Sequence, residues 1–307
     1  MGAGHQHAHA TGRAEDRARL RLVLAVACAV ILVEVVGAWW SGSLALLADA
    51  GHMVTDAAAI GLALSASYIA TLPPNDRRTF GLHRAEILSA LVNAVVLLAV
   101  CAYLAYAGVR RLVHPPEVET GPMLVFALVG LVANGASLLL LVRRRESSLN
   151  MRGAYLEVLG DLFGSALVVI AAVVLMVTGF RRADPLASLL IAVLILPRAY
   201  TLVRDAVDVL LETTPADLDL DEVRGHLCRV PGVVDVHDLH AWTITSGIPV
   251  LSAHVTVTDA VLASRGVGPL LDEFSRCVAG HFEVEHATFQ IEPESHQDHE
   301  DLGPAHA

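Results

Sequence analysis

The segment Ala48-Asp-Ala-Gly-His-Met-Val-Thr-Asp56 decides the fold, because it places ionisable side chains inside a long apolar run. Asp49, His52 and Asp56 lie within Leu44–Leu72, which exceeds the roughly 20 apolar residues that cross a bilayer as a helix. An ionisable group near the middle of a bilayer costs roughly 2.5–3.5 kcal/mol even on lenient insertion scales. The segment therefore predicts a membrane-spanning helix that carries a functional polar site.

A second apolar run, Ala154–Thr178, repeats this pattern with Glu157 and Asp161. His52 and Asp56 are four residues apart, as are Glu157 and Asp161, so each pair lies on one face of its helix. Two helices with such faces can supply two ligands each to a common site. The spacing therefore predicts that the two helices are neighbours.

The two faces can meet only if they lie at the same depth in the bilayer. A helix that began at Ala154 would leave Glu157 near the inner surface, so we expect this helix to begin near Ser147. The four ligands then form a nitrogen and oxygen site that suits a divalent transition metal, Zn²⁺ first. The alternative is a polar core whose members only hydrogen-bond to one another. Three carboxylates around one imidazole need a cation, which favours the metal.

Charge counting gives a further expectation for this site. With His52 neutral, three ionised carboxylates exceed the charge of a divalent ion by one. A buried excess charge tends to be neutralised, so we expect a proton to remain on Glu157 when the metal is bound. Glu34 and Asp49 are weaker candidates. Glu34 is equally suited to hydrogen bonding and to an ion pathway, and Asp49 lies near the outer end of its helix, where it can line an aqueous mouth.

The composition places these runs in a polytopic membrane protein. Of 307 residues, 54% are hydrophobic and 17% are charged, with a mean hydropathy of +0.57, whereas soluble domains are about one quarter charged. The net charge of −11 argues against nucleic acid as a partner. The cysteines form no CxxC pair, so we expect reduced thiols that pack as small hydrophobic groups.

Six runs are predicted to span the bilayer: Leu22–Trp40, Leu44–Leu72, Ile87–Val109, Met123–Val142, Ala154–Thr178 and Pro185–Val203. The last of these is expected to be kinked or ended by Pro197.

Arginine in the connecting segments predicts the orientation, because cytoplasmic loops are enriched in positive charge. Eleven arginines fall on the side of the N-terminus and four on the other, which places both termini in the cytoplasm. The larger set is Arg13, Arg17, Arg19, Arg21, Arg77, Arg78, Arg84, Arg143, Arg144, Arg145 and Arg152, and the smaller set is Arg110, Arg111, Arg181 and Arg182. We therefore expect a multi-pass protein of the cell membrane, plasma or inner, without a cleaved signal peptide.

Polar histidine-containing tails are expected at both ends of the chain. Residues 1–21 carry His5, His7 and His9, for which metal delivery and a plain polar tail are equally open. Residues 294–307 are expected to be disordered.

Past the sixth run, residues 213–293 predict a soluble α+β domain. Charges become frequent there and apolar residues alternate over short stretches. The expected elements are a helix over Asp221–Arg229, strands over Val233–Thr243 and Val250–Thr258, a helix over Ser264–Gly280 and a strand over Ala287–Glu292. Two helices on one face of a three-stranded sheet leave the other face open.

The open face of this sheet is a candidate for a second metal site. Side chains alternate across a strand, and we expect Val234 and Val236 to face the helices. The open face then presents His237, His254, Gln290 and Glu292. The alternative is a set of solvated polar residues on an exposed sheet.

Other histidines of this domain are weaker candidates. On a continuous strand His240 and Trp242 would point into the core, where His240 would be structural. His281 and His286 are expected in loops or on the surface.

The sequence resembles the cation diffusion facilitator family, most closely its bacterial cobalt–zinc–cadmium efflux branch. The resemblance covers roughly residues 15–293, and it is carried by four motifs. These are Ser43–Asp56, Thr79–Glu86, Asn150–Ser165 and Asp238–Thr245. It implies six spans with a cytosolic ferredoxin-like metal-binding domain, a homodimer, and exchange of metal ions for protons out of the cytoplasm.

The resemblance also implies the site residues. The family's transport-site positions match His52, Asp56, Glu157 and Asp161, and its cytosolic metal site matches the open face, with Gln290 and Glu292 in place of the more usual His and Asp. Zinc-selective members commonly have His where this chain has Glu157, so transport of Cd²⁺ or Co²⁺ beside Zn²⁺ is expected. Asp49, His240 and His286 remain further candidates.

Two other function classes are less consistent with the sequence. A membrane metalloenzyme would need an open metal position with a general base, and no HExxH motif is present. A metal sensor without flux does not explain why the charged cluster lies within the spans. No GxxxxGK[ST] motif is present for an ATP-driven pump, and neither enzymatic activity nor an organic cofactor is expected.

Overall fold

The computed structural model describes residues 4–142, 149–245, 247–282, 284 and 286–299. The chain divides into two compact units. The first contains residues 1–63 and 92–203, and the second contains residues 64–91 and 204–307. The described part does not include the side chains of His5, His7 and His9 or the residues beyond His299.

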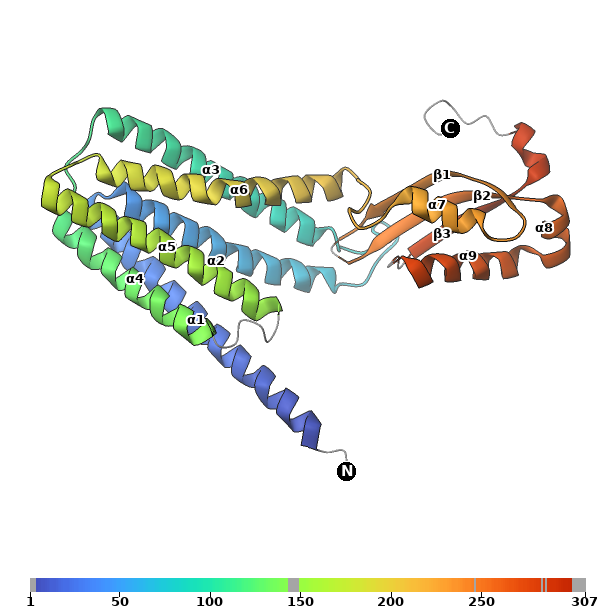
Figure 1. Ribbon diagram of the computed structural model, residues 1–307, viewed down its shortest axis with the longest axis horizontal. Coiled ribbons are helices and arrows are strands. Elements are labelled where there is room, and N and C mark those ends of the chain that lie inside the picture. Colours follow the sequence, from blue (N-terminus) through green and yellow to red (C-terminus); the bar gives the residue numbers. More distant parts are fainter. Residues whose placement is uncertain (1–3, 143–148, 246, 283, 285, 300–307) are drawn as a thin grey trace. The chain divides into compact units, whose positions relative to one another are not determined.

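Six long helices form the membrane part of the chain (Figure 1). They are α1 (Gly4–Ser41), α2 (Leu44–Ala70), α3 (Ala85–Val113), α4 (Thr120–Val142), α5 (Leu149–Thr178) and α6 (Ala183–Leu210). All six are long and apolar enough to cross a membrane. Large apolar side chains such as Trp39 and Val177 are exposed, as expected for surfaces that face lipid. The prediction of a six-span membrane protein is confirmed.

Two of the predicted helix boundaries bear on the candidate site. The helix α5 is in place from Leu149, so it begins before Ala154, as the depth argument required. Pro197 does not end the sixth helix, because α6 continues to Leu210. A proline removes only one backbone donor, and membrane helices tolerate this where neighbouring groups satisfy the freed carbonyl.

Small and polar side chains join the helices of the first unit. Gly37 of α1 lies against the Phe126 ring of α4, where an added Cβ would come within 2.5 Å of the ring. Asn134 Nδ2 of α4 donates to Ser165 Oγ of α5 at 3.1 Å, as expected for an amide that links helices.

The N-terminus of α2 depends on a carboxylate from a distant part of the chain. Asp184, in the first turn of α6, is fully buried and accepts hydrogen bonds from Ser43 Oγ (2.5 Å), Leu44 N (2.9 Å) and Ala45 N (3.1 Å). Arg111 Nη1 lies 3.7 Å from its Oδ2. A helix N-terminus has free N–H donors and a partial positive charge, so a carboxylate stabilises it.

The second unit contains the soluble α+β domain. Its elements are α7 (Leu220–Cys228), β1 (Val233–Thr243), β2 (Pro249–Val257), α8 (Asp259–Arg265), α9 (Val267–His281), β3 (His286–Pro293) and the 3₁₀ helix η1 (Glu294–His299). The sheet order is β1-β2-β3, with β1 antiparallel and β3 parallel to β2. Val223 of α7 and Phe274 of α9 pack with Leu251 of β2 in one apolar core. This agrees with the predicted fold class.

One predicted helix of this domain is wrong in detail. The stretch Ser264–Gly280 is not one helix, because α8 ends and α9 begins around Gly266. Gly266 has φ +76°, a left-handed conformation that favours glycine and interrupts a helix.

Two irregularities in β1 change which side chains face outward. The pairing with β2 shifts between Val233 and Asp235, and again between His237 and His240. Val234 is therefore exposed rather than packed against the helices. Asp238 has φ +46°, and beyond it the alternation is reversed. His240 consequently lies on the open face beside His237, and the expectation that it faces the core is wrong.

The capping carboxylate gives a stability prediction. Asp184→Ala leaves three buried donors at the start of α2 (Ser43 Oγ, Leu44 N and Ala45 N) without this acceptor, so we expect the free energy of unfolding to fall by about 2 kcal/mol or more. Thermal unfolding of the detergent-purified protein measures this. The matched control is Glu117→Ala, which removes an exposed carboxylate paired with Arg181 and should change stability by no more than about 0.5 kcal/mol. Equal shifts in the two variants would contradict the capping role.

Candidate metal-binding sites

The first candidate site lies between α2 and α5. His52 Nε2 is 3.4 Å from Asp56 Oδ2 on its own helix and 3.9 Å from Asp161 Oδ1 on α5. One ligand atom from each of these three residues lies within 4.8 Å of the others. The structure thus brings together three of the four residues that the sequence analysis selected.

Glu157, the fourth residue, lines cavities beside this group. A cavity of about 290 Å³ is bordered by Asp56, Glu157 and Asp161, and one of about 810 Å³ by His52, Glu157 and Arg198. Its side chain is half-buried, one turn of α5 before Asp161. Glu157 is not part of the three-residue ligand group, but it borders both cavities that reach that group.

The site contains a cation that sequence reasoning missed. Arg198 Nη1 of α6 donates to Asp56 Oδ2 at 3.2 Å, and the arginine side chain is 49% exposed. The available signal was an arginine inside an apolar span, directly after Pro197. This guanidinium changes the charge balance. Three ionised carboxylates, one guanidinium and a divalent ion sum to zero, so this count alone does not require the proton on Glu157, which stays a prediction.

Buried polar atoms of this site have unused ligand capacity. Among the described residues, His52 Nδ1 and Asp161 Oδ1 are buried without a hydrogen-bond partner. Such atoms are costly unless a ligand, ion or water satisfies them. The donor set of one imidazole and carboxylates fits a divalent transition metal.

A separate polar cluster lies next to this site. Asp49 is 1% exposed and accepts a hydrogen bond from Ser165 Oγ at 3.0 Å. An added Cβ at Gly164 would collide with the Asp49 carboxylate, so glycine makes room for it. Asp49 is therefore a buried hydrogen-bonding partner of α5, and it also borders the cavity of about 810 Å³. Glu34 is also buried, and its carboxylate lies against Gly130 of α4.

The second candidate site lies on the open face of the sheet. Glu292 Oε1 is 3.0 Å from His254 Nδ1, and its Oε2 is 3.3 Å from His237 Nε2. Glu292 is nearly fully buried, whereas the two histidines are 12% and 22% exposed. The three residues form a group of potential ligands from three strands, as the alternation predicted.

Neighbouring polar groups surround this open-face set. Gln290 Nε2 donates to Glu292 Oε1 at 2.7 Å and fixes the carboxylate. Asp238 lies 2.8 Å from His240 Nε2 and 3.6 Å from His254 Nε2. Gln290 and His240 therefore lie around the ligand group rather than in it. His286 is exposed and lies against the Phe80 ring, outside the group.

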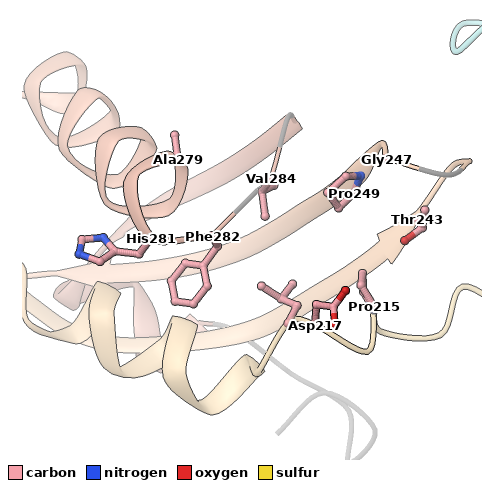
Figure 2. Close-up of a pocket in the computed structure, with 10 residues that line it drawn as sticks. Pro215, Asp217, Thr243, Gly247, Pro249, Ala279, His281, Phe282 and Val284 are labelled. Carbon is pink, nitrogen blue, oxygen red and sulfur yellow. The ribbon is translucent and has the colours of Figure 1, made fainter. Parts of the chain in front are cut away.

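A cavity of about 650 Å³ lies at one end of the domain (Figure 2). Pro249, Phe282 and Asp217 line it, and the His281 ring points away from Pro249 in this view. Its described lining includes one carboxylate and one imidazole, which is too few for a metal site. We assign this cavity no metal site of its own.

Comparison with known proteins gives the same assignment for both parts of the chain. Residues 20–211 match the family model for the cation efflux transmembrane domain, and residues 215–294 match the model for the cation efflux protein cytoplasmic domain. The metal cation efflux system protein CzcD of Cupriavidus metallidurans is 41% identical over 95% of this chain and 90% of its own length. The zinc transporter ZitB of Escherichia coli is 42% identical over 85% of this chain and 83% of its own.

A third relative is the cadmium, cobalt and zinc/H(+)-K(+) antiporter of Bacillus subtilis. It is 36% identical over 87% of this chain and 86% of its own length. These matches extend through the membrane helices and the soluble domain alike. The chain therefore belongs to the cation efflux family, the cation diffusion facilitator family that its motifs resemble.

Proposed function

We propose that this protein exports Zn²⁺, and also Cd²⁺ or Co²⁺, from the cytoplasm in exchange for protons. The observation that carries the proposal is the convergence of His52, Asp56 and Asp161 from two membrane helices. The relatives named as a zinc transporter and as a cadmium, cobalt and zinc antiporter support the choice of ions.

In this proposal the ion is bound by His52, Asp56, Glu157 and Asp161. Glu157 contributes the fourth ligand from the wall of the two cavities. Protons and metal compete for the same lone pairs of these ligands, so binding one releases the other. Exposure of the site to the more acidic side then expels the ion, and exposure to the cytoplasm reloads it.

Arg198 gives this exchange its charge balance. The site without metal carries three carboxylates and one guanidinium, a net charge of minus two. One divalent ion or two protons neutralise that charge equally well. The paired guanidinium also keeps Asp56 from remaining an isolated buried charge when the ion has left.

The proposal also covers the cytosolic domain, the oligomeric state and the cellular location of the protein. Zn²⁺ also binds His237, His254 and Glu292, as a regulatory ion of the cytosolic domain. The protein acts as a homodimer in the cell membrane, with both termini in the cytoplasm and without enzymatic activity or an organic cofactor. Retention of metal without flux is the competing function, and transport assays decide between the two.

Removal of a central ligand should abolish exchange. Asp161→Ala deletes one ligand of the group, so we expect zinc/proton exchange in proteoliposomes to fall to background while the protein remains folded. Asp205→Ala, at an exposed position of α6, is the control and should transport normally. Transport by Asp161→Ala at the wild-type rate would show that the four-residue site is wrong.

Removal of the guanidinium should separate binding from turnover. Arg198→Ala takes away a positive charge beside the ion, so we expect several-fold tighter apparent zinc binding (a lower KM) and a lower maximal rate, because release is slower. Arg198→Lys retains the charge and should stay close to wild type in both parameters. Initial zinc uptake rates over a concentration series measure them. An unchanged KM in Arg198→Ala would refute the charge-balance role.

Substitution of the fourth ligand should change selectivity. Glu157→His replaces an oxygen ligand by imidazole and makes the site softer. We expect zinc transport to persist and the Co²⁺ and Mn²⁺ rates to fall relative to Zn²⁺. The measurement is the ratio of initial rates for the three ions, with Glu157→Gln as the control that keeps an oxygen donor. Identical ratios in wild type and Glu157→His would exclude Glu157 as a ligand.

A further inference from the structure

A third group of potential metal ligands lies on α7 and α9, apart from both sites described above. It consists of His226 of α7 with Cys277 and His281 of α9. One ligand atom from each residue lies within 4.8 Å of the other two. These side chains line one surface groove, together with Arg229, Glu273 and Arg276.

The local geometry directs nitrogen and sulfur ligands toward one point. Cys277 and His281 are one helical turn apart, so they share a face of α9. His281 Nδ1 lies 2.9 Å from the Cys277 backbone oxygen. A proton on Nδ1 donated to that oxygen leaves the Nε2 lone pair available, which is the arrangement usual for metal-bound histidine. The rings of His226 and His281 are 4.4 Å apart between centroids.

The electrostatic surroundings contain opposing contributions. His226 lies in the last turn of α7 and His281 in the last turn of α9, where the helix dipoles favour a cation. Glu222 Oε1 lies 3.9 Å from His226 Nε2 and adds a negative charge. Arg229 opposes a cation but favours a thiolate at Cys277, whereas Glu273 disfavours that thiolate.

The protonation states are compatible with binding. Burial, with Arg229 and His281 nearby, lowers the pKa of His226, which favours the neutral imidazole that offers a lone pair. Burial raises the pKa of the Cys277 thiol, so a metal must displace its proton. Metal uptake here therefore releases one proton from sulfur.

We propose that His226, Cys277 and His281 form a metal site for a borderline or soft divalent ion such as Zn²⁺, Co²⁺ or Cd²⁺. One thiolate and two imidazoles supply three ligands, and water or Glu222 completes a tetrahedral set. Bound metal connects α7 to α9 and stabilises the domain, since binding to the folded state favours it. The inference does not depend on the proposed transport activity.

The sulfur ligand gives the site a spectroscopic signature that separates it from the other two. The proposed transport site and the open-face site contain only nitrogen and oxygen ligands, so a thiolate-to-Co²⁺ charge-transfer band reports this site alone. Titration of Co²⁺ into the full-length protein in detergent should produce that band in the near ultraviolet, and Zn²⁺ should displace it. Cys277→Ser should abolish the band, whereas Cys228→Ser, which changes an exposed cysteine outside the group, should retain it.

Histidine variants keep the test valid if Cys277→Ser destabilises the domain. His226→Ala and His281→Ala should each weaken the band at limiting Co²⁺, with a loss of affinity of roughly tenfold or more, and His286→Ala should leave it unchanged. Zn²⁺ should also protect Cys277, but not Cys228, from alkylation followed by peptide mass spectrometry. Absence of the band in wild type, its persistence in Cys277→Ser, or equal alkylation with and without Zn²⁺ would overturn the proposal.

Discussion

Compensation of buried charge is the constraint on which the membrane part of this protein depends. A carboxylate in an apolar helix is costly unless a cation or hydrogen-bond donors replace water. Asp184 meets this need with the N-terminus of α2 and Arg111, and Asp56 meets it with Arg198. Asp49 relies on the hydroxyl of Ser165. These contacts join α2 to α5 and α6, so the charge that requires compensation also orders the helices.

The three candidate metal sites differ in ligand chemistry in a way that matches different tasks. The intramembrane group has imidazole and carboxylate ligands beside a fixed guanidinium, which suits an ion that must be released as readily as it is bound. The open-face group adds a nearly buried carboxylate, held by Gln290, between two histidines. The group on α7 and α9 contains a cysteine, which as a metal-bound thiolate holds zinc-like ions strongly and suits retention rather than passage.

Glycine positions show how closely the polar clusters are packed. At Gly164 an added Cβ would collide with Asp49, and at Gly130 it would collide with Glu34. Both carboxylates therefore occupy space that only a glycine on the facing helix leaves free. This close approach lets helices with long apolar surfaces bring acidic groups against a neighbouring backbone.

The sequence by itself determined most of the elements and selected most of the candidate ligands. Hydropathy defined six spans, four-residue spacing paired His52 with Asp56 and Glu157 with Asp161, and strand alternation selected His237, His254 and Glu292. These features are local, because they follow from the periods of helices and strands. Only the tertiary structure decided the rest. The bulge at Asp238 turned His240 outward, since one extra residue reverses the alternation. Arg198 contacts Asp56, Asp184 contacts the start of α2, and Cys277 lies next to His226. Each of these contacts joins segments that are distant in the sequence. The periodicity of a helix or strand carries no information about which distant segments meet.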